Sequence, residues 1–415
     1  MPSDPRSHVL VFNAGSSSLK FELFGRAPCW RSSSRGAVKD IGQSHSTFEI
    51  DGESRGADGI DSHAAAAELV IDTILRQANA SEPSGLSLAA TCHRIVHGRE
   101  RFLSPTLITE AVRLELEGLA ELAPLHIPGS LAVVDAAANR FGNVPAIAVF
   151  DTSFFSALPD HVRRYAVPPA WFENEGIRRF GFHGIAHEDM RNRLAGLQGS
   201  GKCPERVVTL QLGHGCSITA LKDGRPVETS MGFTPLEGLV MATRPGDLDV
   251  GAILHMRTRG HSWRALADDL NHESGLRGLS GVSGDVRELL ALESTGHEGA
   301  TLALRAFCHR IHKYLGAYAS VLGGIDAMVF GGGIGENSPV VRSRICAGLG
   351  WLGLELDEAL NAEYEGAEQR ISKPSSSIDV YAVSVHEEEA IARAALDFLG
   401  KQGGPSDQQS SGALQ

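Results

Sequence analysis

The sequence predicts an α/β protein built from two related lobes that face each other across a nucleotide. Three stretches carry this prediction, and each joins an apolar run to a turn of small residues. Residues 9–24 read VLVFNAGSSSLKFELF, and residues 207–221 read VVTLQLGHGCSITAL. Residues 327–338 read AMVFGGGIGENS, in which four of the five positions 331–335 are glycine. Because the strand–turn–strand pattern occurs once in each half of the chain, we infer a duplicated core.

The turn at residues 13–18 joins two apolar runs, and the second run alternates apolar with polar side chains. A period of two is typical of a half-buried strand, so we expect a β-hairpin in an otherwise buried sheet. The backbone N–H groups and hydroxyls of such a turn can close around an anion, with Lys20 as a nearby positive charge. Glycine–serine turns also simply reverse a chain, and both interpretations stay open at this point.

The glycine-rich stretch at residues 331–335 is expected to be a loop between a buried strand and a helix. Ser338 is expected to cap this helix, because Pro339 stands at the first helical position and VVRSRICAGL follows. Such a loop is suited to receive the nucleoside part of a nucleotide.

A chain of 415 residues is too long for one ordinary hydrophobic core, so we expect two domains. The expected N-terminal lobe covers residues 1–155 and is completed by a C-terminal helix at residues 388–402. The expected nucleotide-binding lobe covers residues 156–387. Residues 403–415 are rich in glycine, serine and glutamine, so we expect a disordered tail.

Composition narrows the class of protein. The net charge of −12 argues against nucleic-acid binding, which requires a basic face. The six cysteines include no CxxC pair, which is typical of a reduced cytoplasmic protein rather than a disulfide framework or zinc site. No run of 18 apolar residues occurs and the N-terminus lacks the apolar core of a signal peptide, so we expect no membrane association.

The remaining elements follow from apolar periodicity and from stop signals. We expect edge strands in residues 27–60, strands at 86–96, 144–150 and 378–383, and helices at 62–80, 107–122, 130–141, 285–292, 302–322 and 387–399. Asp151 directly follows the buried strand 144–150, at the end where open α/β sheets bind ligands. On position alone, a simple turn residue is the alternative.

His183 and His187 stand four residues apart, which would place both on one face of a helix. There is no HExxH motif, and Gly181 and Gly184 make a poor helix start. We therefore interpret His183 as a donor to an anion rather than as a metal ligand.

Three common nucleotide sites are absent from the sequence. There is no GxxxxGK[ST] motif, and the glycines at 331–335 do not spell GxGxxG. The protein-kinase signatures are missing as well. The duplicated two-lobed ATPase core remains, in which one turn from each lobe binds the phosphates.

Eight motifs, in this order, resemble the acetate kinases. They are FNAGSSSLKF, HRIVHG, FDTSF, GFHG, SMGFTPLEGL, TRPGD, GGGIGEN and HEEEAIA. The resemblance implies the duplicated ribonuclease H-like fold of acetate and sugar kinases, actin and heat-shock chaperones, with a nucleotide cleft between the lobes. It also implies reversible, direct in-line phosphoryl transfer between ATP and acetate, giving acetyl phosphate and ADP, with Mg²⁺ or Mn²⁺. We further expect a homodimer.

The resemblance assigns roles to individual positions. Arg94 and Arg244 match the arginines that hold the carboxylate and the transferring phosphoryl group. Asp151 matches the active-site aspartate, and His183 matches the histidine on the transition state. The metal positions are Asn13 and Glu387, and the acceptor pocket is formed by Arg94, Val96, Leu125, Phe182 and Pro235. The nucleotide positions are Asn13, Ser16, Ser18, Lys20, Gly213, His214, Gly215, Asp285, Val286, Arg287, Gly333, Ile334, Gly335 and Asn337.

These residue types suit the chemistry. A carboxylate nucleophile has a pKa far below 7 and needs no strong general base. The enzyme must instead bring two anions together and neutralise the transferring group, by positioning and electrostatics. We therefore expect Asp151 to orient substrate or metal rather than to form a phosphoenzyme.

Several positions depart from the family pattern. Gln211 and His214 stand in the second phosphate turn, which is generally HLGNG, and Val286 replaces an aromatic residue. Arg99 stands where glycine is usual. Either the sequence has drifted within a subfamily, or the phosphoryl donor has changed. We expect His214 to contact the β- or γ-phosphate of the donor, with a pKa raised above ~6.5 by that anion.

Two alternatives remain beside an acetate kinase. One is a related acyl kinase that uses propionate, or a non-ATP donor such as pyrophosphate. The other is an ATP-driven conformational scaffold of the actin or chaperone type. A scaffold would need neither Arg94 and Arg244 nor an apolar acceptor pocket, and all of these are present.

Overall fold

The computed structural model describes residues 8–25, 31–57, 59–81, 86–199, 201–366 and 368–402. The chain divides into two compact units. The first runs to Phe150 and resumes at Glu388, and the second spans Asp151–Glu387. The division thus falls at Phe150 rather than at residue 155. The expected disordered tail, 403–415, lies outside the described residues.

The first unit contains, within the described ranges, an eight-stranded sheet with the order β5-β4-β3-β2-β1-β6-β8-β7. β1 pairs antiparallel with β2 and parallel with β6, and β6 pairs parallel with β8. The strands are β1 (His8–Ala14), β2 (Ser18–Gly25), β3 (Arg31–Lys39), β4 (Thr47–Ile50), β5 (Glu53–Gly56), β6 (Leu88–Ile95), β7 (Thr106–Leu107) and β8 (Ala146–Phe150).

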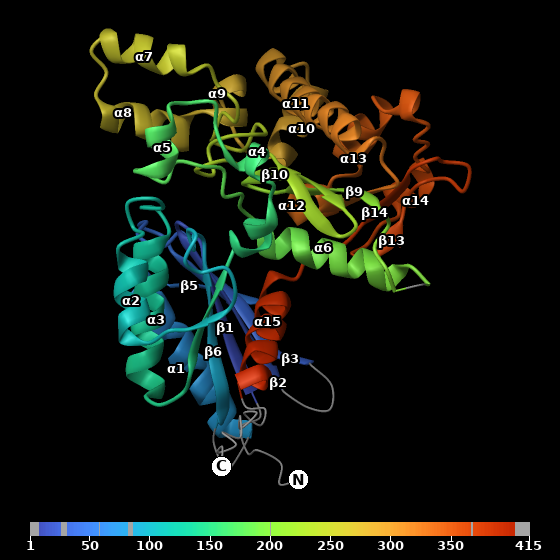
Figure 1. Cartoon of the computed structure of the whole chain (residues 1–415). Coiled ribbons are helices and arrows are strands. Elements are labelled where there is room, and N and C mark those ends of the chain that lie inside the picture. The colour runs from blue at the N-terminus through green and yellow to red at the C-terminus, as the bar shows by residue number, and fades with distance from the viewer. Residues whose placement is uncertain are drawn as a thin grey trace, which may run out of the picture. The chain divides into compact units, whose positions relative to one another are not determined.

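Helices cover both faces of this sheet. They are α1 (His63–Ser81), α2 (Glu110–Glu117), α3 (Ile127–Phe141) and α15 (Glu387–Gln402). Figure 1 shows α1, α2 and α3 on one side of the sheet and α15 on the other. The alternation predicted for β2 is confirmed, because Leu19, Phe21 and Leu23 are buried while Lys20 is exposed. Removing such apolar side chains from water is the main stabilising contribution to the core.

The second unit contains, where the structure describes it, a six-stranded sheet with the order β11-β10-β9-β12-β14-β13. Its strands are β9 (Arg206–Leu212), β10 (Cys216–Lys222), β11 (Arg225–Thr229), β12 (Ala327–Gly331), β13 (Gln369–Arg370) and β14 (Asp379–Ala382). α11 (Glu298–Leu322) covers one face and α6 (Gly184–Leu197) the other (Figure 1).

The other elements of the second unit are short. The helices are α4 (Asp160–Arg163), α5 (Pro169–Glu173), α7 (Val250–Thr258), α8 (Trp263–Asp268), α9 (Gly275–Ser280), α10 (Val286–Ser294), α12 (Gly332–Asn337), α13 (Pro339–Ala347) and α14 (Glu358–Ala362). Single turns of other helix types are η1 (Ser153–Ala157), η2 (Asp269–Glu273) and η3 (Gly350–Leu352).

The two sheets share one topology, which confirms the duplication inferred from the sequence. In each, the first strand pairs antiparallel with the second and parallel with the next long strand of its unit, β6 or β12. A further parallel strand, β8 or β14, follows. The two predicted turns, at residues 13–18 and 213–215, therefore occupy equivalent places at the ends of β1 and β9.

Three expectations about local structure were wrong. The glycine-rich stretch after β12 forms the helical turn α12 instead of a loop. α6 begins at Gly184 although glycine is a poor helix former, and His183 is its N-cap residue. The helix expected at 107–122 is only α2, which Thr109 caps by accepting from the backbone N–H of Val112.

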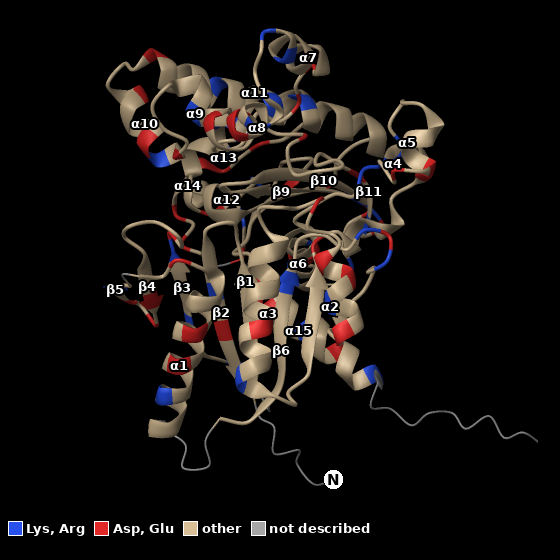
Figure 2. Ribbon diagram, turned by 90° about the vertical axis from the view of Figure 1, so that its left-hand side faces the viewer, with Lys and Arg blue, Asp and Glu red and all other residues tan. Residues whose placement is uncertain are grey.

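The charged residues of the surface form no large basic face in the view of Figure 2. Figure 2 shows acidic and basic residues interspersed along α1, α2 and α10, without a basic stripe in this view. Among the described residues, no helix combines the length and the apolar character needed to cross a membrane.

Candidate active site

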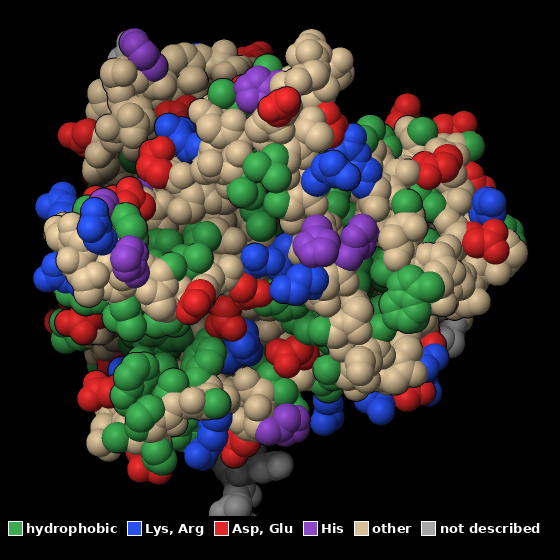
Figure 3. Space-filling model, turned by 90° about the horizontal axis from the view of Figure 1, so that it is seen from above, with side chains coloured by type: hydrophobic (Ala, Val, Ile, Leu, Met, Phe, Trp, Pro, Cys, Tyr) green, Lys and Arg blue, Asp and Glu red, His purple; other side chains and the backbone are tan. Residues whose placement is uncertain are grey.

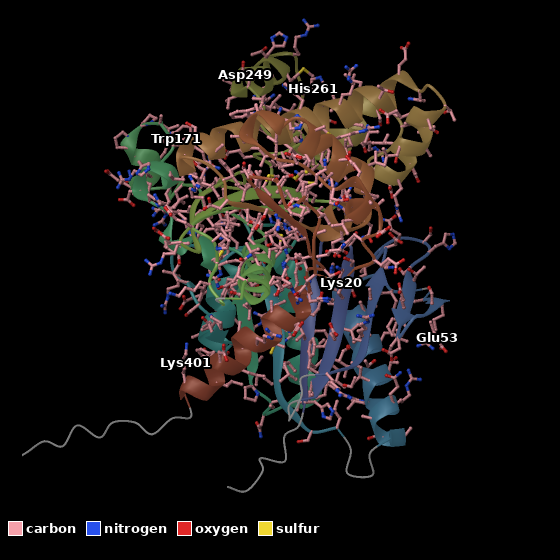
Figure 4. The ribbon with its side chains drawn as sticks, turned by 90° about the vertical axis from the view of Figure 1, so that its right-hand side faces the viewer. Lys20, Glu53, Trp171, Asp249, His261 and Lys401 are labelled. Atoms are coloured by element: carbon pink, nitrogen blue, oxygen red, sulfur yellow. The ribbon has the colours of Figure 1, made fainter. Side chains whose placement is uncertain are left out.

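The first phosphate turn lies between β1 and β2. Its backbone is closed by a hydrogen bond from the N–H of Gly15 to the carbonyl of Ser18, at 2.8 Å. The Nε2 atom of His63, the first residue of α1, lies 2.8 Å from the carbonyl oxygen of Gly15. Ser16 is exposed and Ser18 is half-buried. Lys20, which is labelled in Figure 4, is exposed as well. The turn therefore presents hydroxyls and an ammonium group on a rigid backbone.

The side chain of Asn13 forms hydrogen bonds with two charged side chains beside this turn. Its Nδ2 donates to Glu388 Oε1 at 2.8 Å, and its Oδ1 accepts from Arg94 Nη1 at 3.0 Å. Glu388 is a residue that the sequence analysis missed. The only signal was the run of acids at 387–389, which is also explained by the favourable interaction of acids with the positive end of a helix. Glu387, the expected metal residue, belongs to the second unit.

The second phosphate turn forms one wall of a cavity of about 560 Å³ in the second unit. Eight of the predicted nucleotide positions line this cavity: Gly213, His214, Asp285, Val286, Arg287, Gly333, Ile334 and Asn337. These residues come from three separate parts of the chain, so the structure brings together what the motifs only suggested. The lining residues that the sequence analysis missed are Ala242, Thr243, Arg277, Gly284 and Ser338.

Among the predicted nucleotide positions of the second unit, Gly215 and Gly335 lie outside the lining of this cavity. Gly335 is buried, and its carbonyl accepts a hydrogen bond from Arg342 Nη1 at 2.8 Å. Gly215 faces other groups: a Cβ atom there would lie 2.8 Å from Arg244 Nη2 and 3.2 Å from His183 Nε2. The absence of a side chain at Gly215 therefore lets the arginine and the histidine approach the second phosphate turn.

His183 is held in a strained position. Its backbone φ of 59° is left-handed, which costs a non-glycine residue about 1–2 kcal/mol. The next residue, Gly184, donates to the carbonyl of Asp151 at 3.0 Å, and a Cβ atom at Gly184 would lie only 2.0 Å from that oxygen. Strained residues cluster at functional sites when the surrounding structure imposes them, as it does here. Asp151 itself is buried.

Arg244 is a half-buried cation without a carboxylate partner among the described residues. Its Nη1 donates to the carbonyl of Pro235 at 2.9 Å, and burial lowers its pKa. Removing a charge from water is costly unless a partner compensates it. An anionic ligand between Arg244, His183 and the second phosphate turn would provide that compensation.

The four apolar acceptor positions are divided between the units. Val96 and Leu125 lie in the first unit, where Val96 is buried and Leu125 is exposed. Phe182 and Pro235 lie in the second, where Phe182 is buried and Pro235 is half-buried.

Two residues that depart from the family pattern, His214 and Gln211, lie in or beside the second phosphate turn. His214 lines the cavity as expected, and burial, followed by the charge of Arg244, lowers its pKa from the ordinary value. The expectation concerned a pKa raised by bound donor phosphate, and it stays a prediction. Gln211 at β9 has a buried Oε1 atom without a hydrogen-bond partner among the described residues.

The fold and these residues define a class of protein: a phosphotransferase of duplicated α/β architecture, with a glycine-containing turn at the equivalent place in each unit. The family model of the acetokinase family matches residues 8–393. The chain therefore belongs to the acetokinase family, and the resemblance inferred from the motifs is confirmed.

Individual relatives agree with this assignment. The chain is 38% identical over 398 residues to an acetate kinase from Bacteroides thetaiotaomicron, covering 95% of this chain and 100% of that protein. A crystal structure of Porphyromonas gingivalis acetate kinase matches with a TM-score of 0.85 at 36% identity, covering 95% of this chain and 100% of the other. A propionate kinase from Francisella tularensis matches with a TM-score of 0.85 at 32% identity, covering 94% and 99%.

Proposed function

We propose that this chain is a kinase that transfers the γ-phosphoryl group of ATP directly to acetate, reversibly and with Mg²⁺. The observation that carries the proposal is Arg244, a cation without a described carboxylate partner that approaches the second phosphate turn beside His183. A scaffold of the actin or chaperone type needs no such group.

The donor is assigned to the second unit. A cavity of about 560 Å³ has room for a nucleoside, whereas pyrophosphate would leave most of it empty. Gly213, His214 and Gly215 of the second unit would bind the donor phosphates, and Ser16, Ser18 and Lys20 are the phosphate-binding positions proposed in the first unit. Asp285 and Arg287 form an ion pair at the start of α10, with Nη2 and Oδ2 2.5 Å apart, which orders the cavity wall.

The chemistry requires two anions to meet. Arg94 and Arg244 would hold the acetate carboxylate and the transferring phosphoryl group, and His183 would donate to a phosphoryl oxygen. Because acetate is already ionised at neutral pH, no strong base is required, and Asp151 would orient the reactants. These groups stabilise charge that develops in the transition state, which is typically the largest catalytic contribution.

The metal is assigned to the first phosphate turn and to the acids that begin α15. Mg²⁺ usually binds one or two carboxylates together with substrate phosphates. Asn13 holds the carboxylate of Glu388 beside this turn, so the donor set fits Mg²⁺ or Mn²⁺. Asn13, Glu387 and Glu388 would hold the ion, which would neutralise phosphate charge when bound.

Acetate is preferred over propionate in this proposal, although one structural relative is a propionate kinase. Val96, Leu125, Phe182 and Pro235 are bulky, and a hydrophobic pocket discriminates one methylene by ~1–3 kcal/mol. Val96→Ala should therefore narrow the preference. A wild-type kcat/KM that is higher for propionate than for acetate would overturn this assignment.

A homodimer is proposed from the surface of the second unit. α7 has no buried residue, and Leu248, Val250, Leu254 and Trp263 on and beside α7 and α8 are exposed. Figure 3 shows such hydrophobic side chains among charged ones on the face seen from above. Exposed apolar clusters often mark interfaces, and a second copy would cover this one. Leu254→Lys should lower the mass measured by light scattering, and an unchanged mass would exclude this interface.

The cytoplasm is the proposed location. Five cysteines, Cys92, Cys203, Cys216, Cys308 and Cys346, are free thiols, and Cys29 lies outside the described residues. Free thiols are typical of reducing compartments.

The direct test of function detects acyl phosphate as its hydroxamate, with acetate, propionate and butyrate as acceptors and with ATP, GTP and pyrophosphate as donors. The expected product requires acetate and ATP. Arg244→Ala should lower kcat by ~10²–10³-fold with an unchanged circular dichroism spectrum. Wild-type kcat in this variant would remove Arg244 from the mechanism.

A further inference from the structure

A chain of four side chains leads from the interior of the second unit to His183. Thr209 Oγ1 on β9 lies 2.7 Å from Nδ1 of His187 on α6. Nε2 of His187 lies 2.7 Å from Oγ of Ser217 on β10, and Ser217 Oγ lies 2.9 Å from Nδ1 of His183. Thr209, His187 and Ser217 are fully buried, so water does not compete for these hydrogen bonds.

The chemistry of a hydroxyl restricts this chain to two arrangements. A hydroxyl donates one hydrogen, while a neutral imidazole donates from one nitrogen and accepts at the other. Because the two ring nitrogens are the partners of its Oγ, Ser217 uses its single hydrogen when it donates to one histidine and accepts from the other. Once Ser217 is oriented, the tautomers of both His183 and His187 follow.

The position of His183 selects between the two arrangements. Its Nε2 atom approaches Gly215 beside Arg244, where the phosphoryl oxygens of the donor are assigned. Phosphoryl oxygens only accept hydrogen bonds, so Nε2 must carry a hydrogen, and in a neutral imidazole Nδ1 then accepts one. Ser217 then donates to His183, His187 donates to Ser217 through Nε2, and Thr209 donates to Nδ1 of His187.

We propose that Ser217 and His187 are positioning residues that hold His183 as the neutral tautomer with hydrogen on Nε2, directed at the transferring phosphoryl group. This inference rests on the proposed role of His183. It explains why a histidine is buried four residues after His183, where no metal cluster exists among the described residues. The low pKa of His187, caused by burial and then by His183, is consistent with a neutral relay.

The test compares Ser217→Ala with a matched control on the same strand. Thr219 lies two residues along β10, is equally buried, and forms its hydroxyl hydrogen bond with Thr229 Oγ1 at 2.9 Å. Thr219→Val therefore removes a buried hydroxyl from the same sheet face without altering the chain to His183. Ser217→Thr restores a hydroxyl and serves as the rescue variant.

Ser217→Ala should lower kcat on the order of 10–100-fold, the usual effect of removing a partner that orients a functional side chain, with KM for ATP unchanged. Ser217→Thr should recover most of this loss, and Thr219→Val should retain wild-type kcat. In protein labelled with ¹⁵N-histidine, the His183 signals should report hydrogen on Nε2 in the wild type and a mixture of tautomers in Ser217→Ala. His183→Gln identifies those signals by their loss.

The proposal is overturned if the wild-type enzyme carries the hydrogen on Nδ1 of His183. It is also overturned if Ser217→Ala keeps the wild-type kcat while His183→Gln loses activity. If His183→Gln itself retains wild-type kcat, the proposed role of His183 fails instead, and the two failures are distinguished.

Discussion

Replacing Glu237 with glutamine should loosen the loop that carries Pro235. The Glu237 carboxylate accepts from Arg179 Nη2 at 2.6 Å and from the Tyr165 hydroxyl at 2.5 Å. Arg179 also donates to the carbonyls of residues 229–231, and the Tyr165 oxygen accepts from the N–H of Phe233 at 2.8 Å. Three side chains thus hold residues 229–237, and Pro235 in that loop accepts from Arg244.

The expected magnitude follows from burial. Removing one partner of a buried ion pair costs about 3–5 kcal/mol because the other charge remains uncompensated. The side chain of Arg179 is 15% exposed and that of Glu237 is 32% exposed, so water screens part of this loss. Glutamine also retains an oxygen that can accept from Arg179. We therefore expect Glu237→Gln to lower the free energy of unfolding by about 2 kcal/mol.

The kinetic effect of Glu237→Gln should appear in KM for the acceptor, acetate, rather than in KM for the donor, ATP. The loop orients Arg244 through the Pro235 carbonyl, whereas the cavity assigned to the nucleotide is lined by other residues. KM for acetate should rise in Glu237→Gln while KM for ATP stays constant. Urea unfolding and steady-state kinetics measure the two effects.

The matched control is Glu293→Gln, which removes an ion pair with Arg344 in the same unit, at 2.6 Å. The arginine left without its partner is more exposed there, 37% for Arg344 against 15% for Arg179, so the loss should cost less than ~1 kcal/mol and leave both KM values unchanged. The reasoning is refuted if Glu237→Gln unfolds at the wild-type urea midpoint, or if KM for acetate is unaffected.

Three further predictions concern pH and backbone strain. Burial lowers the pKa of His93 to about 3, and burial together with Arg99 lowers that of His97 to about 4. The unfolded state, with a pKa near 6.5, therefore binds more protons below that pH. The free energy of unfolding should fall on acidification below pH ~6.5 by up to ~1.4 kcal/mol per pH unit for each histidine. This prediction is contradicted if the free energy of unfolding of His93→Gln depends on pH between 5 and 7.5 as steeply as that of the wild type. Arg99 has a left-handed φ of 53°, so Arg99→Gly should raise the free energy of unfolding by up to about 1 kcal/mol, and a lower urea midpoint would count against strain. Burial and the charge of Arg244 lower the pKa of His214, which by itself predicts that KM for ATP does not change with pH between 7 and 9. A slope that is present in the wild type and missing in His214→Asn would show that bound phosphate raises this pKa, and curves of the same shape would exclude this effect.

Local sequence patterns were sufficient to predict most of the helices and strands. The alternation in β2, the Asp285 cap of α10 and the left-handed Gly323 that ends α11 are each encoded within a few neighbouring residues. Periodicity and capping act over one or two turns of chain, so they are readable without knowledge of the fold. The same reasoning identified both phosphate turns, because each interrupts two apolar runs with small residues.

Tertiary contacts overrode local preference at α12. Glycine is unfavourable in helices, and a loop was the natural prediction for residues 331–335. The fully buried Arg342 donates to the carbonyls of Gly335 and Glu336 and to the side chain of Asn361. These hydrogen bonds compensate the backbone cost, and no pattern within the glycine run reveals them.

The sequence by itself determined which residue types belong to the site, because the arginines, the glycine turns and the order of the motifs can be recognised without knowledge of the fold. Only the tertiary structure decided how they interact. Asn13 and Glu388 are 375 positions apart, and Ser217 reaches His183 across 34 positions. Hydrogen bonds require donor and acceptor atoms within about 3 Å, a condition that distant residues satisfy only after strands and helices have packed. The hydrogen bonds of Glu388, Ser217 and His187 could therefore be identified only in the folded protein.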